Sequence, residues 1–167
     1  MIEFEVAGAF EIATTKNKGG KGIEAPNCES FREDFSNEVD CHGVYVFCIS
    51  ASGSLNPWYV GKATKSFSQE IFTPDKLNKY NTVLRKIEKG KPAIFFICAP
   101  RSRGKKNDSV VGSIEKKLIE LCAESNPSLL NKHNNKPHRW SIKGVLRSSR
   151  GKRSAGAEKF RRMIGLD

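Results

Sequence analysis

Two short apolar runs, residues 43–49 and 58–61, place the strongest constraint on how this chain folds. Both are rich in β-branched and aromatic residues, which at this length favour strands. A stretch of Ser, Ala, Gly, Leu, Asn and Pro, residues 50–57, separates them. The order predicts a β-hairpin whose loop is longer than the two-residue minimum.

Two further strands are predicted on either side of this hairpin. Residues 2–12 alternate between apolar and acidic side chains, as a half-buried strand does, with Gly8 as a bulge. Residues 93–99 form a fully apolar run of strand length, which predicts the central or third strand. Residues 14–27, rich in Gly and Lys, are expected to be a flexible connection, and residues 29–40 suggest a short helix.

Helices are predicted in three places. Thr73-Pro74-Asp75 combines an N-cap, a proline at the first helical position and an acid in the first turn, and Gly90 is expected to close that helix. Residues 114–122 carry Ile114, Leu118, Leu121 and Cys122 at helical spacing. Ser154 is suited to cap a short helix that runs through Ile164.

Together these elements predict an α/β fold: a small three-stranded antiparallel or mixed sheet flanked by helices. We expect an N-terminal strand extension over residues 1–40, a core over residues 41–135 and a basic C-terminal tail over residues 136–167. The apolar runs are too short to span a membrane, and no secretory signal is recognised at the N-terminus. The odd number of cysteines, five, shows no metal-binding spacing and favours buried thiols in a reducing cytoplasm.

The charge of the chain points to a polyanionic partner. The formal net charge is +11, and the cations gather in a loop after residue 100 and in the C-terminal tail. Clustered Lys and Arg typically contact nucleic-acid phosphates, and an aromatic side chain among them can stack on a base. The predicted nucleic-acid-binding residues are Arg101, Arg103, Lys105, Lys106, Arg139, Trp140, Lys143, Arg147, Arg150, Lys152 and Arg153.

Several short motifs occur in the order that typifies one nuclease superfamily. Gly43-Val44-Tyr45 and Tyr59-Val60-Gly61-Lys62-Ala63 lie on the predicted hairpin, Glu115 opens a helical motif, and residues 126–131 read NPSLLN. Over residues 41–135 the chain resembles the GIY-YIG nuclease superfamily. One position departs from the pattern, because Gln69 stands eight residues after Gly61, where the family normally has a helix arginine.

The resemblance implies a metal-dependent nuclease and a role for each matched residue. Glu115 would bind one Mg²⁺ or Mn²⁺, with water and phosphate oxygens completing the coordination. Tyr45 would act as general base or position the attacking water, and Lys62 would lower the Tyr45 pKa or contact the phosphate. The hydroxyl of Tyr59 would bind phosphate or water. Asn131 would brace the site by hydrogen bonds.

A cation is needed where the family arginine is missing, because a neutral glutamine cannot offset the charge of the transition state. Among Lys65, Lys76 and Lys79 we select Lys76, in the first turn of the next helix, as the substitute. The residues alone also allow plainer roles, namely core packing for the two tyrosines and a solvated surface position for Glu115.

The sequence therefore predicts a DNA endonuclease that hydrolyses phosphodiester bonds by water attack. Two alternatives stay open: a catalytically impaired nucleic-acid-binding protein on the same scaffold, and an RNA-binding protein. A homodimer or a partner subunit is also compatible with the length of the chain, and no membrane partner is expected. The substrate sequence and the biological role are not encoded in any recognisable feature.

Overall fold

The computed structural model describes residues 2–87, 89–100, 108–131, 142–143, 145, 151 and 153–166. The chain divides into two compact units, residues 1–135 and residues 136–167.

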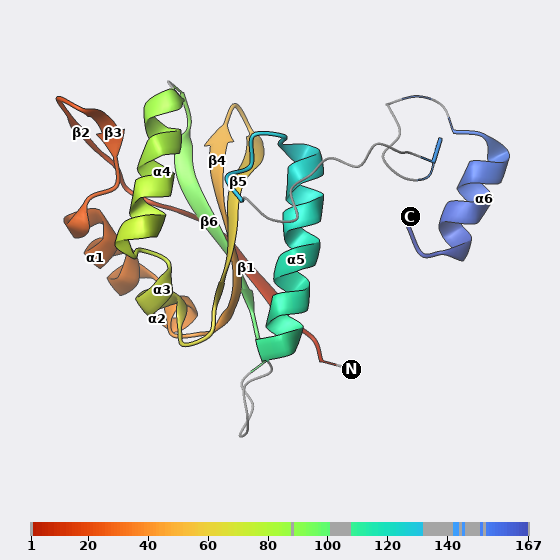
Figure 1. Cartoon of the computed structure of the whole chain (residues 1–167), viewed down its shortest axis with the longest axis horizontal. Helices are drawn as coiled ribbons and strands as arrows, with labels where there is room; N and C mark the ends of the chain where they lie inside the picture. Colours follow the sequence, from red (N-terminus) through yellow and green to blue (C-terminus); the bar gives the residue numbers. More distant parts are fainter. Residues whose placement is uncertain are drawn as a thin grey trace. The chain divides into compact units, whose positions relative to one another are not determined.

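The first unit is built on one antiparallel sheet that, in the described residues, has four strands (Figure 1). The strands are β1 (Glu5–Glu11), β4 (Gly43–Ala51), β5 (Ser54–Ala63) and β6 (Lys91–Cys98), in the order β1-β6-β4-β5. The α/β class is as predicted, but the prediction of three core strands is wrong. The apolar strand β6 has two edges to pair, and β1 hydrogen-bonds to the edge that β4 leaves open.

The bulge predicted at Gly8 is confirmed. The register between β1 and β6 shifts between Ala7 and Phe10, and Gly8 adopts φ +124°. A Cβ added at Gly8 would lie 2.8 Å from the carbonyl oxygen of Ile94, so only glycine fits this close approach.

The hairpin of β4 and β5 is tighter than predicted. Both strands continue to a two-residue turn at Ser52 and Gly53, which have φ of 49° and 78°. Positive φ at both central residues is the type I′ geometry that matches strand twist. Pro57, expected in the loop, lies instead within β5, where an edge strand with a register shift tolerates a residue without an N–H.

The segment before the hairpin is also more ordered than predicted. Residues 15–22 form a second, two-stranded sheet from β2 (Thr15–Asn17) and β3 (Gly20–Gly22). The side-chain amide of Asn81 fixes the next residue, Ile23, by accepting from its N–H at 2.8 Å and donating to its carbonyl at 3.1 Å. Two helices follow, α1 (Ala25–Asp34) and α2 (Ser36–Val39), where a single short one was predicted.

Helices cover both faces of the sheet (Figure 1). On one face lie α1, α2, α3 (Phe67–Glu70) and α4 (Pro74–Lys86); on the other lies α5 (Asp108–Ser125). Thr73 is the N-cap residue of α4 with Pro74 in the first turn, as predicted, although the helix ends at Lys86, before Gly90.

The buried stripe of α5 differs in part from the prediction. Leu121 is 49% exposed, whereas Ile119 and Ala123 are buried. The other three predicted residues, Ile114, Leu118 and Cys122, pack partly buried against this core, so the predicted stripe is confirmed except at Leu121 and is extended by Val111.

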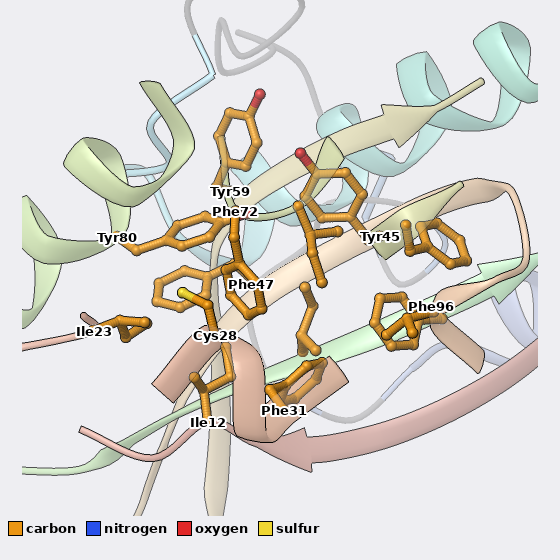
Figure 2. Packing of buried hydrophobic residues seen from close by; sticks show 14 of the residues in the cluster. Ile12, Ile23, Cys28, Phe31, Tyr45, Phe47, Tyr59, Phe72, Tyr80 and Phe96 are labelled. Carbon is orange, nitrogen blue, oxygen red and sulfur yellow. The ribbon is translucent and has the colours of Figure 1, made fainter. Parts of the chain in front are cut away.

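Strand alternation divides the core into two clusters, as predicted for β4. Tyr45, Phe47 and Ile49 belong to an aromatic core under α1–α4 (Figure 2), while Val44 belongs to a smaller aliphatic core under α5. The aromatic core includes close ring pairs such as Phe47 stacked on Tyr80, with centroids 4.1 Å apart.

The second unit contains α6 (Ala155–Met163). Its predicted cap is confirmed, because the hydroxyl oxygen of Ser154 accepts a hydrogen bond from the N–H of Ala157 at 3.2 Å. Arg161 donates to the carbonyl of Val145 at 2.6 Å and also to that of Leu166. In the described parts of both units, no helix has the length and apolarity needed to cross a membrane.

Candidate active site

Four consecutive residues of β5, Tyr59 to Lys62, form the centre of the candidate site. Each of them contacts a different residue that the sequence analysis had singled out. The contacts come from β4, from α4, from α5 and from the segment after α5. In chain order from Tyr59, the partners are Lys76, Asn131, Tyr45 and Glu115.

Tyr59 binds the lysine that the sequence analysis chose to replace the missing arginine. The ammonium of Lys76 donates to the Tyr59 hydroxyl at 2.9 Å. Burial lowers the pKa of Lys76, but the hydrogen bond to Tyr59 and the nearby Asp75 carboxylate outweigh burial, so the pKa is raised. Lys76 is therefore a fixed cation next to a phenol oxygen.

Val60 is held by Asn131, which is buried. The side-chain oxygen of Asn131 accepts from the N–H of Val60 at 2.9 Å, and its amide donates to the Val60 carbonyl at 2.8 Å. The same segment covers the outer edge of β5 further along, because Leu130 donates to Trp58 and Asn126 donates to Pro57. The bracing role predicted for Asn131 thus has a physical basis: its side chain takes the place of a neighbouring strand.

Gly61 lies directly beneath the ring of Tyr45. A Cβ added at Gly61 would come within 2.5 Å of the hydroxyl oxygen of Tyr45, so any side chain here would displace the ring. The ring centroids of Tyr45 and Tyr59 are 6.2 Å apart, and both hydroxyls lie at the same border of the aromatic core (Figure 2). Only a residue without a side chain at position 61 permits this close approach of the Tyr45 ring.

The acid–base state of Tyr45 differs from the prediction. Burial raises the pKa of Tyr45 well above its ordinary value, nearby Tyr59 raises it further, and the hydroxyl of Tyr80 offsets this only in part. The shift is opposite to the lowering that was predicted from Lys62. Tyr45 is therefore a protonated phenol at neutral pH, able to donate a hydrogen bond but not to act as a phenolate base.

Lys62 and Glu115 meet on the other face of the sheet. The ammonium of Lys62 lies 3.5 Å from a carboxylate oxygen of Glu115, whose side chain is 20% exposed. Burial and Tyr59 dominate the raised pKa of Tyr45, and the Glu115 carboxylate makes the smallest contribution to it.

A metal ion would have one protein ligand here. Among the described residues, no group of three or more His, Cys, Asp or Glu gathers to form a closed metal site. Mg²⁺ commonly uses one or two carboxylates together with water and phosphate oxygens. A partly exposed Glu115 beside a cation that attracts phosphate fits that open kind of site.

Sequence analysis missed one residue next to the site, Glu70. A single carboxylate oxygen of Glu70 accepts from the N–H groups of Thr64 and Lys65, both at 2.8 Å. These bonds fix the turn that follows β5. No local pattern predicts such a bond, because it depends on α3 folding back onto the strand end. Gln69, one residue earlier on α3, is exposed.

Most of the predicted nucleic-acid-binding residues lie outside the described residues. Lys143 and Arg153 are described, and both are exposed in the second unit. The others are Arg101, Arg103, Lys105, Lys106, Arg139, Trp140, Arg147, Arg150 and Lys152.

Comparisons with protein-family models, with curated proteins and with solved structures found no match for this chain.

Proposed function

We propose that this protein is a metal-dependent DNA endonuclease of the GIY-YIG type, which hydrolyses phosphodiester bonds with the help of one Mg²⁺ or Mn²⁺. One observation carries the proposal. Three residues that the resemblance selected, Tyr45, Glu115 and Asn131, contact the four-residue stretch 59–62 of β5. Lys76, chosen as the substitute for the family arginine, contacts the same stretch, so the four residues come from four separate parts of the chain.

The contact between Tyr45 and Gly61 follows from the register of the hairpin, but the contacts of Lys76, Glu115 and Asn131 with β5 do not. A tyrosine, a lysine, a glutamate and an asparagine with purely structural roles would each satisfy their polar atoms wherever the fold allowed. Here two ammonium groups, two phenol hydroxyls and one carboxylate are arranged around a strand that carries a glycine at its centre. Phosphodiester hydrolysis needs positive charge at the phosphate, an oriented water and an anionic metal ligand.

Each residue has a role that its surroundings support. Lys76, fixed at the Tyr59 hydroxyl, supplies the positive charge that the family arginine would supply. Tyr45 is kept protonated by burial, and its hydroxyl is enclosed in the free protein, so in this proposal it donates to the attacking water or a phosphate oxygen only when bound DNA opens the site. Lys62 contacts the phosphate from the side of α5, and Asn131 holds the strand in place.

Glu115 is the residue that would hold the metal ion. A bound Mg²⁺ or Mn²⁺ would polarise the phosphate and increase the acidity of coordinated water. The basic residues of the loop after residue 100 and of the C-terminal segment would bind the DNA backbone without reading its sequence.

The test compares Glu115→Gln with a matched variant on the same helix, Glu120→Gln. Glu120 pairs with Lys117 at 2.9 Å on the same helix, so Glu120→Gln removes the same charge from α5 without touching the Lys62–Glu115 pair. Supercoiled plasmid, single-stranded DNA and structured RNA are each incubated with Mg²⁺, Mn²⁺ or EDTA. We expect metal-dependent nicking of DNA by the wild type and by Glu120→Gln, and loss of nicking in Glu115→Gln.

The impaired-binder alternative predicts a different pattern. This alternative is favoured by one observation: Gln69, which is exposed and neutral, stands at the position of the family arginine. Tight, salt-sensitive DNA binding with no cutting by any variant would overturn the nuclease proposal and leave this alternative. Selective binding of structured RNA without cutting would favour the RNA-binding alternative.

A further inference from the structure

The first turn of α4 places one carboxylate between two lysines. One oxygen of Asp75 lies 2.5 Å from the ammonium of Lys79 and 3.5 Å from that of Lys76. The Asp75 side chain is 66% exposed, whereas those of Lys76 and Lys79 are 24% and 29% exposed. The two cations are thus partly sheltered, while the anion that joins them lies at the surface.

Tyr59 holds both lysines at the same place. The ammonium groups of Lys76 and Lys79 each lie 5.1 Å from the centre of the Tyr59 ring, and Lys76 also binds the hydroxyl. Cation–π contact and the hydrogen bond therefore position two positive charges at the edge of the candidate active site. The role of Lys79 in this pair goes beyond the function proposed above.

Helix stability explains only part of the arrangement. An acid in the first turn with a lysine four residues later accounts for Asp75 and Lys79, but bringing Lys76 to the same ring gathers two like charges, which opposes folding. An oxygen anion bridging two ammonium groups is, however, the arrangement that a phosphate oxygen adopts between two lysines. Asp75 supplies such an oxygen from within the chain.

We propose that Lys76 and Lys79 together bind one phosphate of the DNA backbone, and that the Asp75 carboxylate occupies this position until DNA displaces it. The inference rests on the proposed function, because it takes DNA to be the ligand. Asp75 then competes with phosphate for the two lysines. Its carboxylate occupies their ammonium groups, which prevents other anions from binding there and lowers the affinity for DNA.

Two neighbouring residues should consequently have effects of opposite sign. Removing the Lys79 charge takes away one phosphate contact, which weakens binding and lowers the slope of log K against log salt by about 1. Removing the Asp75 charge leaves both lysines free to bind phosphate, which tightens binding and makes the slope steeper. If Asp75 and Lys79 formed only a surface ion pair without a part in DNA binding, neither substitution would change the affinity or the salt slope in this way.

The experiment measures binding of a labelled DNA duplex to the full chain by fluorescence anisotropy in EDTA, at several salt concentrations. The variants are Asp75→Asn and Lys79→Gln. The controls are Glu11→Gln and Lys91→Gln, which remove the same charges from another exposed pair, 2.9 Å apart, on β1 and β6. Thermal unfolding of each variant shows whether it is folded.

We expect Asp75→Asn to bind about 3- to 10-fold more tightly and Lys79→Gln about 3- to 10-fold more weakly, with both controls within about 2-fold of the wild type. If Lys79→Gln matches Lys91→Gln, or Asp75→Asn matches Glu11→Gln, the effects are those of net charge and the proposal is overturned.

Cutting by the wild type, assayed in parallel with Mg²⁺, separates this inference from the proposed function. Cutting with unchanged binding by Lys79→Gln overturns only the paired-lysine site. Opposite effects of the two variants on binding, without any cutting by the wild type, support the paired-lysine site and overturn the endonuclease.

Discussion

Replacing Asn131 by alanine tests whether the segment after α5 holds β5, the strand at the centre of the candidate site, in place. The wild-type side chain satisfies both the N–H and the carbonyl of Val60, at 2.9 and 2.8 Å, in a buried position. Alanine leaves both groups without that partner, and each unsatisfied buried polar group costs about 1–3 kcal/mol. For two such groups in a buried position, we expect a total loss of about 2–6 kcal/mol in the free energy of unfolding.

The chain contains a matched control for this change. Asn81 makes the same pair of bonds to the backbone of Ile23, but it is only partly buried, so water can replace its amide. Asn81→Ala should cost about 1 kcal/mol and should leave DNA cutting intact. Asn131→Ala should lower both the unfolding free energy, measured in urea, and the cutting rate.

The reasoning is refuted if Asn131→Ala costs no more than Asn81→Ala in urea unfolding. That result would mean that the edge of β5 is satisfied in another way. A normal cutting rate in a destabilised Asn131→Ala variant would instead show that the position of Val60 does not matter for the chemistry.

Three further predictions concern the strand beside the site and the buried thiols. Gly61→Ala should lower the free energy of unfolding by about 1–3 kcal/mol and abolish cutting, because its Cβ would meet the Tyr45 ring at 2.5 Å. The control is Gly112→Ala on α5, where the nearest atom to an added Cβ is 3.9 Å away, and thermal melts should show it to be at least as stable as the wild type. Tyr45→Phe removes a buried hydroxyl that has no hydrogen bond of normal geometry, so the free energy of unfolding should stay within about 1 kcal/mol of the wild type. The cutting rate should fall about 100-fold, and a cutting rate equal to that of the wild type would remove Tyr45 from the mechanism. Burial raises the pKa of Cys48 to about 11 and that of Cys98 to about 12, from an ordinary 9.0. Below pH 9.0 both thiols are protonated in the folded and the unfolded chain, and above pH 9.0 only the unfolded chain ionises them. The free energy of unfolding should therefore fall above pH 9.0 by up to about 1.4 kcal/mol per pH unit for each thiol. Urea midpoints between pH 8 and pH 11 measure this fall, and Cys98→Ala should make it smaller.

Local patterns were sufficient for the features that depend on neighbouring residues. Alternation in residues 43–49 predicts that Tyr45 and Phe47 face one side of the sheet and Val44 the other, and the two core clusters confirm this. Thr73 and Pro74 predict the start of α4 because capping and a fixed proline φ act within one turn. The tight turn at Ser52 was missed, because only Gly53 in that pair is a typical residue for positive φ.

The sequence predicts most residues of the candidate site, but it does not predict which of them contact one another. The motifs select Tyr45, Tyr59 and Glu115, yet nothing local says that Lys76 binds Tyr59 or that Tyr45 is too buried to ionise at neutral pH. Protonation depends on how many atoms surround a group, which is set by packing across the whole aromatic core. The role of Glu70 is likewise not predicted, because its hydrogen bonds to the backbone of Thr64 and Lys65 form only when α3 folds back onto the end of β5.

Local sequence patterns predict strands β1, β4, β5 and β6, the starts of α4 and α6, the bulge at Gly8 and the residues from which a site can be built. The long-range contacts of the fold bring β1 into the sheet and bring Lys76, Asn131, Tyr45 and Glu115 together on β5. The physical reason is range. Propensity, alternation and capping act over a few residues, whereas strand pairing and side-chain contacts between distant segments are selected by the burial and hydrogen bonding of the entire fold.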